Sequence, residues 1–509
     1  MAVIVNAGEE QRQQWARKNT SRKGNVDLRD QSEFITAAER VGNPKEGEES
    51  VKAPTHDAPS SSPASAPPPF PSPARAWYAV GLLLAIYTLS FIDRQILALL
   101  VGPIKRDLVL SDFEFSLLSG FAFAIFYTFF GLPFARYADR GSRRGLVMFG
   151  VLFWSLATAA CGLARNFAQL FLARVGVGIG EATLTPAANS LIADCFPPER
   201  LGRALAVYSL GIPIGSAMAF IMGGAVVDLV SSLPPWDLPL IGSLHGWQIA
   251  FVIVGLPGLV FAALMLTVKE PYRRGRLRNA DGTHHSIPLR EVVRFVRGRL
   301  RIYGPLFFGA SLLSMLGYGG TLWMIAFFQR AHAMSAGDAG YVFGIILAVF
   351  GTAGILAGGA TADRWLGRGR LDAHLRLLLF GTLAGLPFAI AWPLVPDLAP
   401  AIGLLALSTF FSNLPWGTAY AAIAAITPNE MRGQMAALYL FIVNLIGLGA
   451  GPTVIALFTD RLFGAESALP YSLATASAVI APLAALLFAL GRRPFAEAMA
   501  AARRNAVAG

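Results

Sequence analysis

Twelve long apolar segments follow residue 75, and they constrain the fold of this chain more than any other feature. Each is long enough to cross about 30 Å of hydrocarbon as a helix, at a rise of about 1.5 Å per residue. The chain is 54% hydrophobic and only 14% charged, whereas a soluble domain carries about 25% charged residues. The sequence therefore predicts an all-α polytopic membrane protein and excludes a water-soluble enzyme. The predicted segments are 77–102, 114–136, 145–164, 167–193, 204–229, 247–268, 303–328, 339–362, 376–396, 399–426, 433–459 and 469–490.

The loops between these segments alternate in basic charge. The loops and tail on the side of the N-terminus carry 25 Lys and Arg residues, against five in the opposite loops. Because basic loops stay in the cytoplasm, we expect both termini to be cytoplasmic and the chain to be a multi-pass protein of the inner cell membrane. The same topology accounts for the net charge of +11, so we expect no nucleic-acid partner.

The stretches outside the apolar segments differ in composition. The first 75 residues are polar, and they become rich in Pro, Ser and Ala towards their end, which predicts disorder. In the central linker, apolar residues recur at helical spacing between arginines, which predicts a basic amphipathic helix on the inner leaflet, or equally a plain helical linker. The predicted order is a cytoplasmic tail (1–75), a six-helix bundle (76–268), a cytoplasmic linker (269–302), a second six-helix bundle (303–491) and a cytoplasmic tail (492–509).

The two sets of six segments share sequence motifs as well as hydropathy. A run that follows the fourth segment recurs after the tenth, with every pair offset by 231 residues. We therefore expect two pseudo-symmetric six-helix bundles, with a substrate site between them near the middle of the membrane. The first run is Pro197, Glu199, Gly202, Ala206 and Tyr208, and the second is Pro428, Glu430, Gly433, Ala437 and Tyr439.

The loop between the second and third segments resembles the signature of the major facilitator superfamily. Asp139-Arg140 is followed by a glycine and paired basic residues, although Ala135 stands where glycine is usual and Ser142 occupies the second glycine's position. The resemblance implies the major facilitator fold, with Asp139 capping a neighbouring helix and tying the halves together on the cytoplasmic side. A purely topogenic charge cluster is the alternative. The gate residues implied in the two copies of the motif are Asp139, Arg140, Arg143, Asp363 and Arg364.

A narrower resemblance lies in the first, fourth and eleventh segments. The runs 91–95 and 174–182, with the stretch from Asn444 to Pro452, look like those of the Spinster family within that superfamily. Animal members of that family move lysophospholipids or phosphorylated sphingoid bases. The resemblance, which is to the bacterial type, implies proton-coupled transport and does not specify the substrate.

Four ionisable residues lie well inside the predicted spans. They are Asp93, Arg94, Arg174 and Glu181, and each costs at least about 2.5–3.5 kcal/mol at this depth unless it is paired or functional. We expect Arg174 to meet Asp93 across the helix interface. Our hypothesis is that Asp93 and Glu181 exchange protons, while Arg94 and Arg174 alternate between them and an anionic head group. A static double ion pair is the alternative.

The remaining midplane candidates are neutral. Aromatic walls beside two arginines suit an amphiphilic anion, with an apolar tail beneath a charged head. Any one of these aromatic residues is also compatible with ordinary helix packing. The predicted cavity-lining residues are Tyr127, Tyr208, Tyr318, Asn413, Trp416, Tyr439 and Asn444.

These observations favour a proton-coupled secondary transporter of a lipid-like organic anion that works by alternating access. A multidrug/proton antiporter and a small organic-anion transporter of the same superfamily are alternatives. We expect no enzymatic activity, since the predicted spans bring together no nucleophile, base or metal set. With no Walker loop or metal-ligand spacing, we expect no cofactor and a proton gradient as the energy source. The expected partners are the lipid bilayer and a small amphiphilic substrate, with the chain acting as a monomer.

Overall fold

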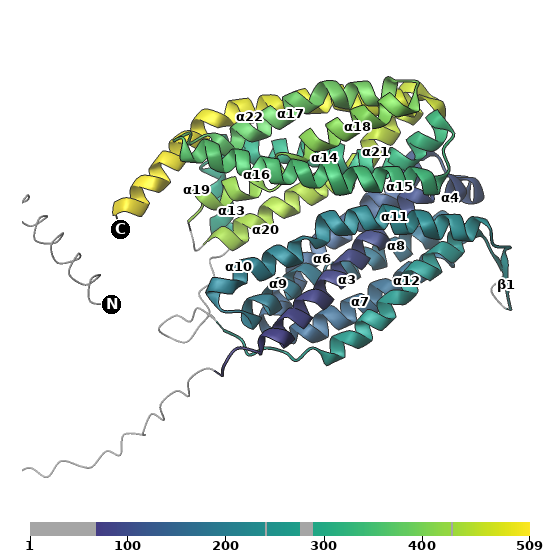
Figure 1. Cartoon of the computed structure of the whole chain (residues 1–509), viewed down its shortest axis with the longest axis horizontal. Helices are drawn as coiled ribbons and strands as arrows, with labels where there is room; N and C mark the ends of the chain where they lie inside the picture. The colour runs from purple at the N-terminus through teal and green to yellow at the C-terminus, as the bar shows by residue number, and fades with distance from the viewer. Residues whose placement is uncertain (1–67, 240–241, 275–288, 429–430, 509) are drawn as a thin grey trace, which may run out of the picture. The chain divides into compact units, whose positions relative to one another are not determined.

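The computed structural model describes residues 68–239, 242–274, 289–428 and 431–508. This part of the chain contains twelve helices that are long and apolar enough to cross a membrane. They form two sets of six (Figure 1), which confirms the predicted all-α class and the number of spans. The predicted disordered tail lies outside the described residues as far as residue 67, and the first helix begins at Pro73.

The first half contains six spans, several of them built from two shorter helices. A short β-hairpin lies between the fifth and sixth spans, and pairs Trp236 with Leu244. Its elements are α3 (Pro73–Leu99), α4 (Val101–Leu108), α5 (Asp112–Ser119), α6 (Phe121–Arg140), α7 (Arg143–Cys161), α8 (Phe167–Glu181), α9 (Leu184–Cys195), α10 (Pro198–Ser209), α11 (Gly211–Ser231), β1 (Trp236–Leu238), β2 (Gly242–Leu244), α12 (Gly246–Leu264) and η2 (Met265–Thr267).

The second half repeats this plan after a short linker helix. Three of its segments, η3, η6 and η7, are π-helical, a conformation that often marks functional positions in helices. Its elements are α13 (Leu289–Arg297), α14 (Leu300–His332), α15 (Ala336–Ile346), η3 (Leu347–Gly351), α16 (Thr352–Gly367), α17 (Ala373–Ala391), η4 (Trp392–Leu394), α18 (Leu398–Asn413), α19 (Thr418–Ile426), α20 (Arg432–Val443), η6 (Asn444–Gly449), α21 (Ala450–Leu457), η7 (Phe458–Phe463), η8 (Glu466–Ala468) and α22 (Leu469–Ala508).

Polar side chains cap the helices that position the charged residues. Ser142 Oγ accepts a hydrogen bond from the Gly145 N–H at the start of α7, at 3.0 Å. Asn166 Oδ1 accepts one from the Gln169 N–H at the start of α8, also at 3.0 Å. These caps satisfy backbone donors that have no partner within the helix, and they fix where α7 and α8 begin.

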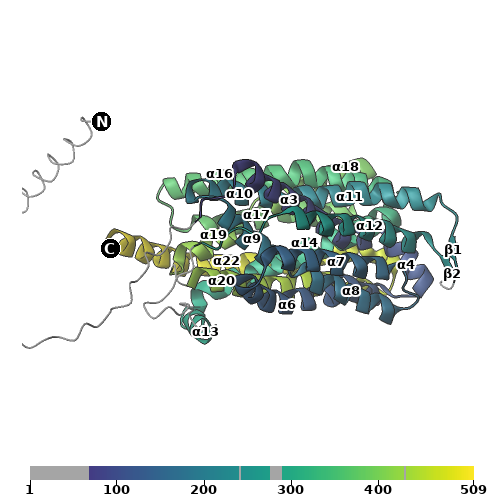
Figure 2. The same cartoon turned by 90° about the horizontal axis from the view of Figure 1, so that it is seen from below.

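The two halves share one hydrophobic core at the end of the bundle that carries α4 and the hairpin. We call this the distal end, and the opposite end, where α3 begins and α22 ends, the terminal end (Figure 2). Buried side chains of the first half, such as Phe115 and Phe220, belong to the same cluster as Trp323 and Phe343 of the second. α11 and α15 run side by side along this seam (Figure 1). The halves are therefore closed against each other at the distal end.

Charged side chains reinforce this distal closure. Asp112, at the start of α5, accepts hydrogen bonds from Arg330, at the end of α14, at 2.6 and 2.7 Å. Asp112 also pairs with Lys105 of α4, and Lys105 Nζ donates to Glu466 Oε1 of η8 at 2.7 Å. Because Lys105 and Asp112 belong to the first half and Arg330 and Glu466 to the second, these ion pairs lock the distal ends together.

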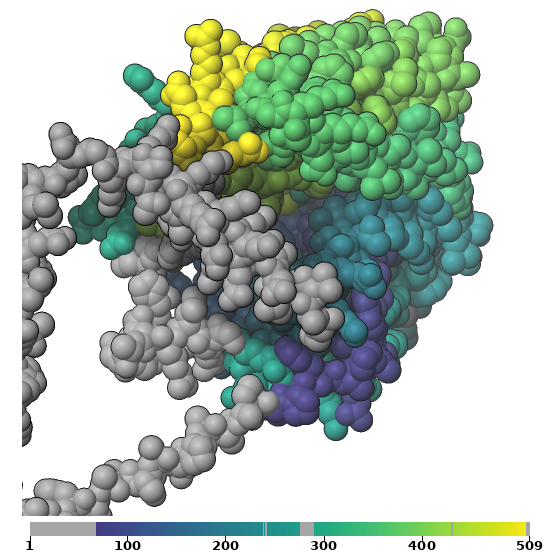
Figure 3. Space-filling model, turned by 60° about the vertical axis from the view of Figure 1, so that its left-hand side comes forward, coloured from purple at the N-terminus to yellow at the C-terminus, as the bar shows by residue number. Residues whose placement is uncertain are grey.

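Towards the terminal end the halves keep separate cores. A second cluster of buried residues, including Tyr303, Tyr439 and Phe488, lies within the second half alone. Figure 3 shows this face, with the second half in green and yellow and the first in purple and teal. Phe129 of α6 and Phe441 of α20 still meet edge to face, with ring centroids 5.4 Å apart. The structure is thus tight at the distal end and looser at the terminal end.

The terminal end differs from the sequence prediction in two details. The predicted tail at 492–509 is a continuation of α22 to Ala508, because Phe495 is fully buried and Arg492 Nη2 donates to Asp372 Oδ2 at 2.7 Å. Burial raises the pKa of Asp372, but hydrogen bonds from Arg376 and Arg492 outweigh it and hold this pKa below its usual value. The predicted amphipathic helix is α13, and its Val292 is buried in the second half's cluster rather than free to enter lipid. Part of the linker, 275–288, lies outside the described residues.

Candidate functional site

The four intramembrane charges come together from two helices of the first half. Asp93 and Arg94 lie on α3, and Arg174 and Glu181 lie on α8. Arg94 Nε donates to Glu181 Oε2 at 2.6 Å, in an ion pair whose side chains are 15% and 0% exposed. The group is thus buried, and its formal charges balance.

Arg174 meets Asp93 through the backbone rather than through the carboxylate. Its Nη1 donates to the Asp93 carbonyl at 3.3 Å, and its Nε donates to the Leu118 carbonyl at 3.4 Å. Leu118 lies in the last turn of α5, where helix carbonyls lack partners within the helix. Arg174 therefore joins α8 to both α3 and α5, the helix that carries Asp112 of the distal ion pairs.

Three carboxylate oxygens of this group accept no hydrogen bond from a described residue. They are Asp93 Oδ1, Asp93 Oδ2 and Glu181 Oε1, and all three are buried. A buried carboxylate is costly when ionised and unpaired, but much less so when protonated. Chemically, the arrangement can take up and release protons at two positions beside two fixed positive charges.

Aromatic rings surround Arg94. Its guanidinium carbon lies 4.8 Å from the ring centroid of Phe123, 4.9 Å from that of Tyr127 and 5.3 Å from that of Phe91. Arg174 lies 5.5 Å from the Phe123 ring. Cation–π contacts of this kind stabilise a guanidinium out of water, so the positive charges are retained in an apolar setting.

Tyrosines extend this group towards the seam. Tyr208 is buried and stacks on Tyr87, with ring centroids 5.0 Å apart. Tyr318 of α14 contributes from the second half, near enough to Arg94 and Tyr127 for electrostatic interaction. The predicted residues Tyr127, Tyr208 and Tyr318 are therefore brought towards the charged group.

The other predicted lining residues lie elsewhere in the second half. Asn413 Nδ2 donates to the Thr409 carbonyl of its own helix at 2.9 Å, and Trp416 is 47% exposed in the turn after α18. Tyr439 packs near Phe307, with ring centroids 5.8 Å apart. Asn444 is half-buried and begins the π-helical segment η6.

Arg143, a predicted gate residue, is the fully buried centre of an ion-pair cluster within the first half. It pairs with Asp194 at the end of α9, and its Nε donates to Glu270 Oε1 at 2.8 Å. Burial raises the pKa of Glu270, but hydrogen bonds from the Arg143 side chain, the Arg144 N–H and the Ser142 hydroxyl hold this pKa below its usual value. In this conformation Arg143 fastens the segment after α12 to α7 and α9.

The remaining gate residues are exposed at the terminal end. The Asp139 carbonyl accepts a hydrogen bond from Arg273 of the same segment. Arg140, Asp363 and Arg364 are exposed, Arg140 at the end of α6 and the other two near the end of α16. The proposed tie between the halves at this end stays a prediction, to be sought in a conformation in which the terminal end closes.

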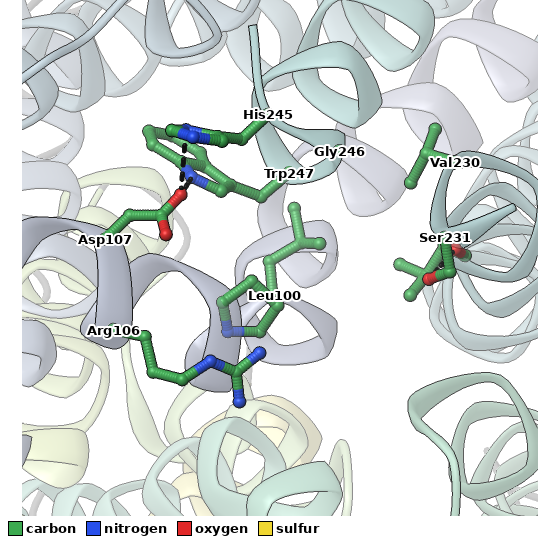
Figure 4. Close-up of a pocket in the computed structure, with 10 residues that line it drawn as sticks. Leu100, Arg106, Asp107, Val230, Ser231, His245, Gly246 and Trp247 are labelled. Carbon is green, nitrogen blue, oxygen red and sulfur yellow. Dashed lines mark hydrogen bonds and ion pairs between the residues drawn. The ribbon is translucent and has the colours of Figure 1, made fainter. Parts of the chain in front are cut away.

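A small cavity of about 210 Å³ lies at the distal end, away from the charged group. It lies between α4, the end of α11 and the start of α12. There Asp107 Oδ2 accepts hydrogen bonds from Trp247 Nε1 at 2.6 Å and from His245 Nδ1 at 3.0 Å (Figure 4). These bonds anchor α4 to the first half, so the cavity belongs to the distal closure rather than to the charged group.

Sequence reasoning missed the distal ion pairs and the aromatic rings around Arg94. Lys105 and Arg330 count only as loop charges in the sequence, but acidic residues at the edges of neighbouring spans, such as Asp112 and Glu466, could have suggested partners for them. Phe91 and Phe123 carry no signal among the chain's 35 phenylalanines. Only the folded arrangement singles them out.

The sequence profile of the Major Facilitator Superfamily matches residues 83–452. The chain is 33% identical over 399 residues to an "MFS-type efflux pump" of Mycolicibacterium smegmatis, covering 77% of this chain and 86% of the relative. It is 27% identical to human "Protein spinster homolog 1", covering 77% of this chain and 74% of the relative.

Among solved structures, the fold is similar to that of a bacterial homologue of the human lysosomal transporter Spinster, in an inward-facing and unoccupied conformation. The TM-score is 0.69 at 28% identity, covering 84% of this chain and 98% of the other. The similarity therefore extends over both halves.

Proposed function

The chain belongs to the major facilitator superfamily, and we propose that within it the chain is a proton-coupled secondary active transporter of an amphiphilic or lipid-like organic anion. It is a multi-pass protein of the inner cell membrane and a transporter, not an enzyme. Its resemblance to Spinster proteins favours the lysophospholipid or sphingoid phosphate class of substrate.

The observation that carries this proposal is the buried pair of Arg94 and Glu181 beside Asp93. Arg94 donates to Glu181 only through Nε, and its two terminal amino groups make no hydrogen bond to a described residue. Its side chain is 15% exposed, so these amino groups are available to an anion. A planar guanidinium binds phosphate or carboxylate through two parallel N–H bonds. The same arginine can thus hold both an internal acid and a substrate.

Protonation provides the link between the proton and the anion. When Glu181 takes up a proton, its attraction for Arg94 weakens, and the guanidinium is freed for the anionic head of the substrate. When the proton leaves, Glu181 competes for Arg94 again. Phe91, Phe123 and Tyr127 provide an apolar lining that suits a hydrophobic tail. Asp93 acts as the second proton site, next to Arg174.

Alternating access follows from the two ends of the seam. The shared core and the ion pairs of Asp112 and Lys105 close the distal end, whereas the terminal end has separate cores. With both termini in the cytoplasm, as the loop charges favour, this is an inward-facing arrangement. Rocking of the two halves about the charged group exchanges which end is closed.

The proposal includes the working state of the protein. The protonmotive force drives transport, with no cofactor and no nucleic-acid partner. The chain acts as a monomer in the lipid bilayer, since both halves of the seam come from one chain.

Proton flux in proteoliposomes tests this function. The purified protein is reconstituted with a pH-sensitive dye inside, and lysophospholipid is added outside. We expect a proton flux in the wild type and none in protein-free vesicles or in Glu181→Gln. Absence of flux in the wild type with lysophospholipids and sphingoid phosphates alike would overturn the lipid assignment.

A multidrug/proton antiporter is the second candidate, and the identity to a mycobacterial efflux pump favours it. Such a protein prefers cationic substrates, which two arginines at the site oppose. Thermal unfolding distinguishes the candidates, because a ligand that binds the folded state raises its Tm. Protection by lysophospholipid but not by ethidium supports the anion transporter, and the reverse supports the antiporter. Protection by hexuronate alone points to a small organic-anion transporter.

A further inference from the structure

We propose that Trp154 and Thr158 of α7 are positioning residues for proton coupling, because they hold two hydrogen-bond donors in reserve for the ionised form of Asp93. This inference rests on the proposed function, in which Asp93 gains and loses a proton. It assigns to α7 a role in setting the proton affinity of α3.

The geometry brings four buried polar atoms together without hydrogen bonds. Asp93, Trp154 and Thr158 are each 0% exposed. The two Asp93 carboxylate oxygens, Trp154 Nε1 and Thr158 Oγ1 have no hydrogen-bond partner among the described residues. The indole and the hydroxyl nevertheless lie against this carboxylate. Their spacing of four residues places both on one face of α7.

A static packing role does not account for this arrangement. A buried N–H or O–H without an acceptor is unfavourable, and folded proteins satisfy most such groups. An ionised carboxylate only accepts hydrogen bonds and has room for several, whereas a protonated one needs fewer donors. Two unused donors beside one acid therefore suit a residue that is neutral in this conformation and ionised in another.

Other charged and titratable groups also face Asp93. Arg174 and Glu181 approach from α8, Arg94 lies beside it on α3, and Cys161 lies at the end of α7. In this structure Arg174 donates to the Asp93 carbonyl and not to its carboxylate. On ionisation, Arg174 and the two α7 donors all become available to the carboxylate, so the donors act together with the arginine.

Infrared titration of the purified full-length protein tests the inference. The carbonyl band of a protonated buried carboxyl group is assigned to Asp93 by its loss in Asp93→Asn, and its intensity is followed with pH. We expect Thr158→Val and Trp154→Phe each to raise the pH midpoint of this band by about one unit, since a hydrogen bond to a charged group is lost. Thr158→Ser keeps the hydroxyl and should restore the wild-type midpoint.

Ser155→Ala is the matched control. Ser155 Oγ is also buried on α7 without a partner among the described residues, but it packs against Gly258 of α12 and should leave the midpoint unchanged. Wild-type midpoints in both Thr158→Val and Trp154→Phe would overturn the inference, as would an equal shift in Ser155→Ala. The proposed function fails separately, if Asp93→Asn retains proton-driven transport.

Discussion

Arg94 and Arg174 sit in the same buried group, yet the structure gives them different tasks. The side chain of Arg94 is 15% exposed and pairs with a carboxylate, whereas Arg174 is 1% exposed and binds two backbone carbonyls. The first is placed to exchange partners with a substrate. The second is placed to hold α3, α5 and α8 together.

Replacing Arg94 by lysine should weaken substrate binding while retaining the positive charge. Lysine lacks the planar pair of donors that binds an oxyanion, so we expect KM for the transported anion to rise about tenfold, the effect of losing about 1.4 kcal/mol. Uptake into proteoliposomes measures KM, with Arg140→Lys as the exposed control. An unchanged KM in Arg94→Lys would remove Arg94 from the binding site.

The identity of these residues could be predicted from the sequence, but their pairing could not. Four charges inside apolar spans stand out in any reading of the chain. Whether Arg174 reaches the carboxylate or the carbonyl of Asp93 depends on side-chain rotamers and on the break in the helix at Gly120. Hydropathy and spacing do not contain that information.

α5 is the element that joins the charged group to the distal closure. Leu118 at one end of it binds Arg174, and Asp112 at the other end binds Arg330. Between them, Ser116 Oγ donates to Thr453 Oγ1 across the seam at 3.2 Å. Movement of Arg174 can thus be passed to the ion pairs through one short helix.

Asp112→Asn should favour opening of the distal end. Removing one partner of a buried ion pair costs about 3–5 kcal/mol, and because Glu466 of this network is exposed we expect a smaller, about tenfold, rise in opening. The measure is the rate at which a maleimide labels Ser116→Cys in a background where Cys161 and Cys195 are replaced. Asp338→Asn, at the exposed cap of α15, is the control. Equal labelling in all variants would show that the ion pairs do not hold this end closed.

α11 and α15 depend on glycine for their close approach. A Cβ added at Gly340 would lie 2.7 Å from the Phe220 carbonyl oxygen, so Gly340→Ala must push the helices apart, at a cost of about 1–3 kcal/mol. We expect faster labelling at the same Ser116→Cys probe and a lower Tm. Gly359→Ala, in the same span but with open space around it, should change neither. A neutral Gly340→Ala would contradict the tight seam.

The segment after α12 is fastened by Glu270, and this fastening depends on pH. Because Arg143 lowers the pKa of Glu270 in the folded protein, its contribution to stability is complete above the ordinary Glu pKa of about 4.3. It disappears as pH falls through the lowered pKa. Glu270→Gln should therefore cost about 1–2 kcal/mol at neutral pH.

Thermal unfolding between neutral and acidic pH measures this effect. The Tm of Glu270→Gln should lie below that of the wild type at neutral pH and converge with it as the pH is lowered. Glu199→Gln, at an exposed position in the first turn of α10, should follow the wild type throughout. A constant difference at all pH values would mean that the charge of Glu270 contributes nothing.

For the whole molecule, hydropathy was enough to predict twelve spans, and the internal repeat was enough to divide them into two halves. The breaks within spans were not predictable, because η3, η6 and η7 arise from packing between helices and not from local sequence. The closed distal end could not be predicted either. One sequence must support two arrangements of its halves, and the loop charges report orientation rather than state.

Counterflow and proton-driven accumulation, compared in Glu181→Gln, test the central claim most directly. Glutamine imitates the protonated acid, so we predict that the variant still exchanges labelled for unlabelled anion across vesicles without a pH gradient. It should lose accumulation against a concentration gradient when a pH gradient is imposed. Retained accumulation would show that Glu181 does not couple protons to transport. Loss of both activities together with a lowered Tm would show that the ion pair of Arg94 and Glu181 is structural.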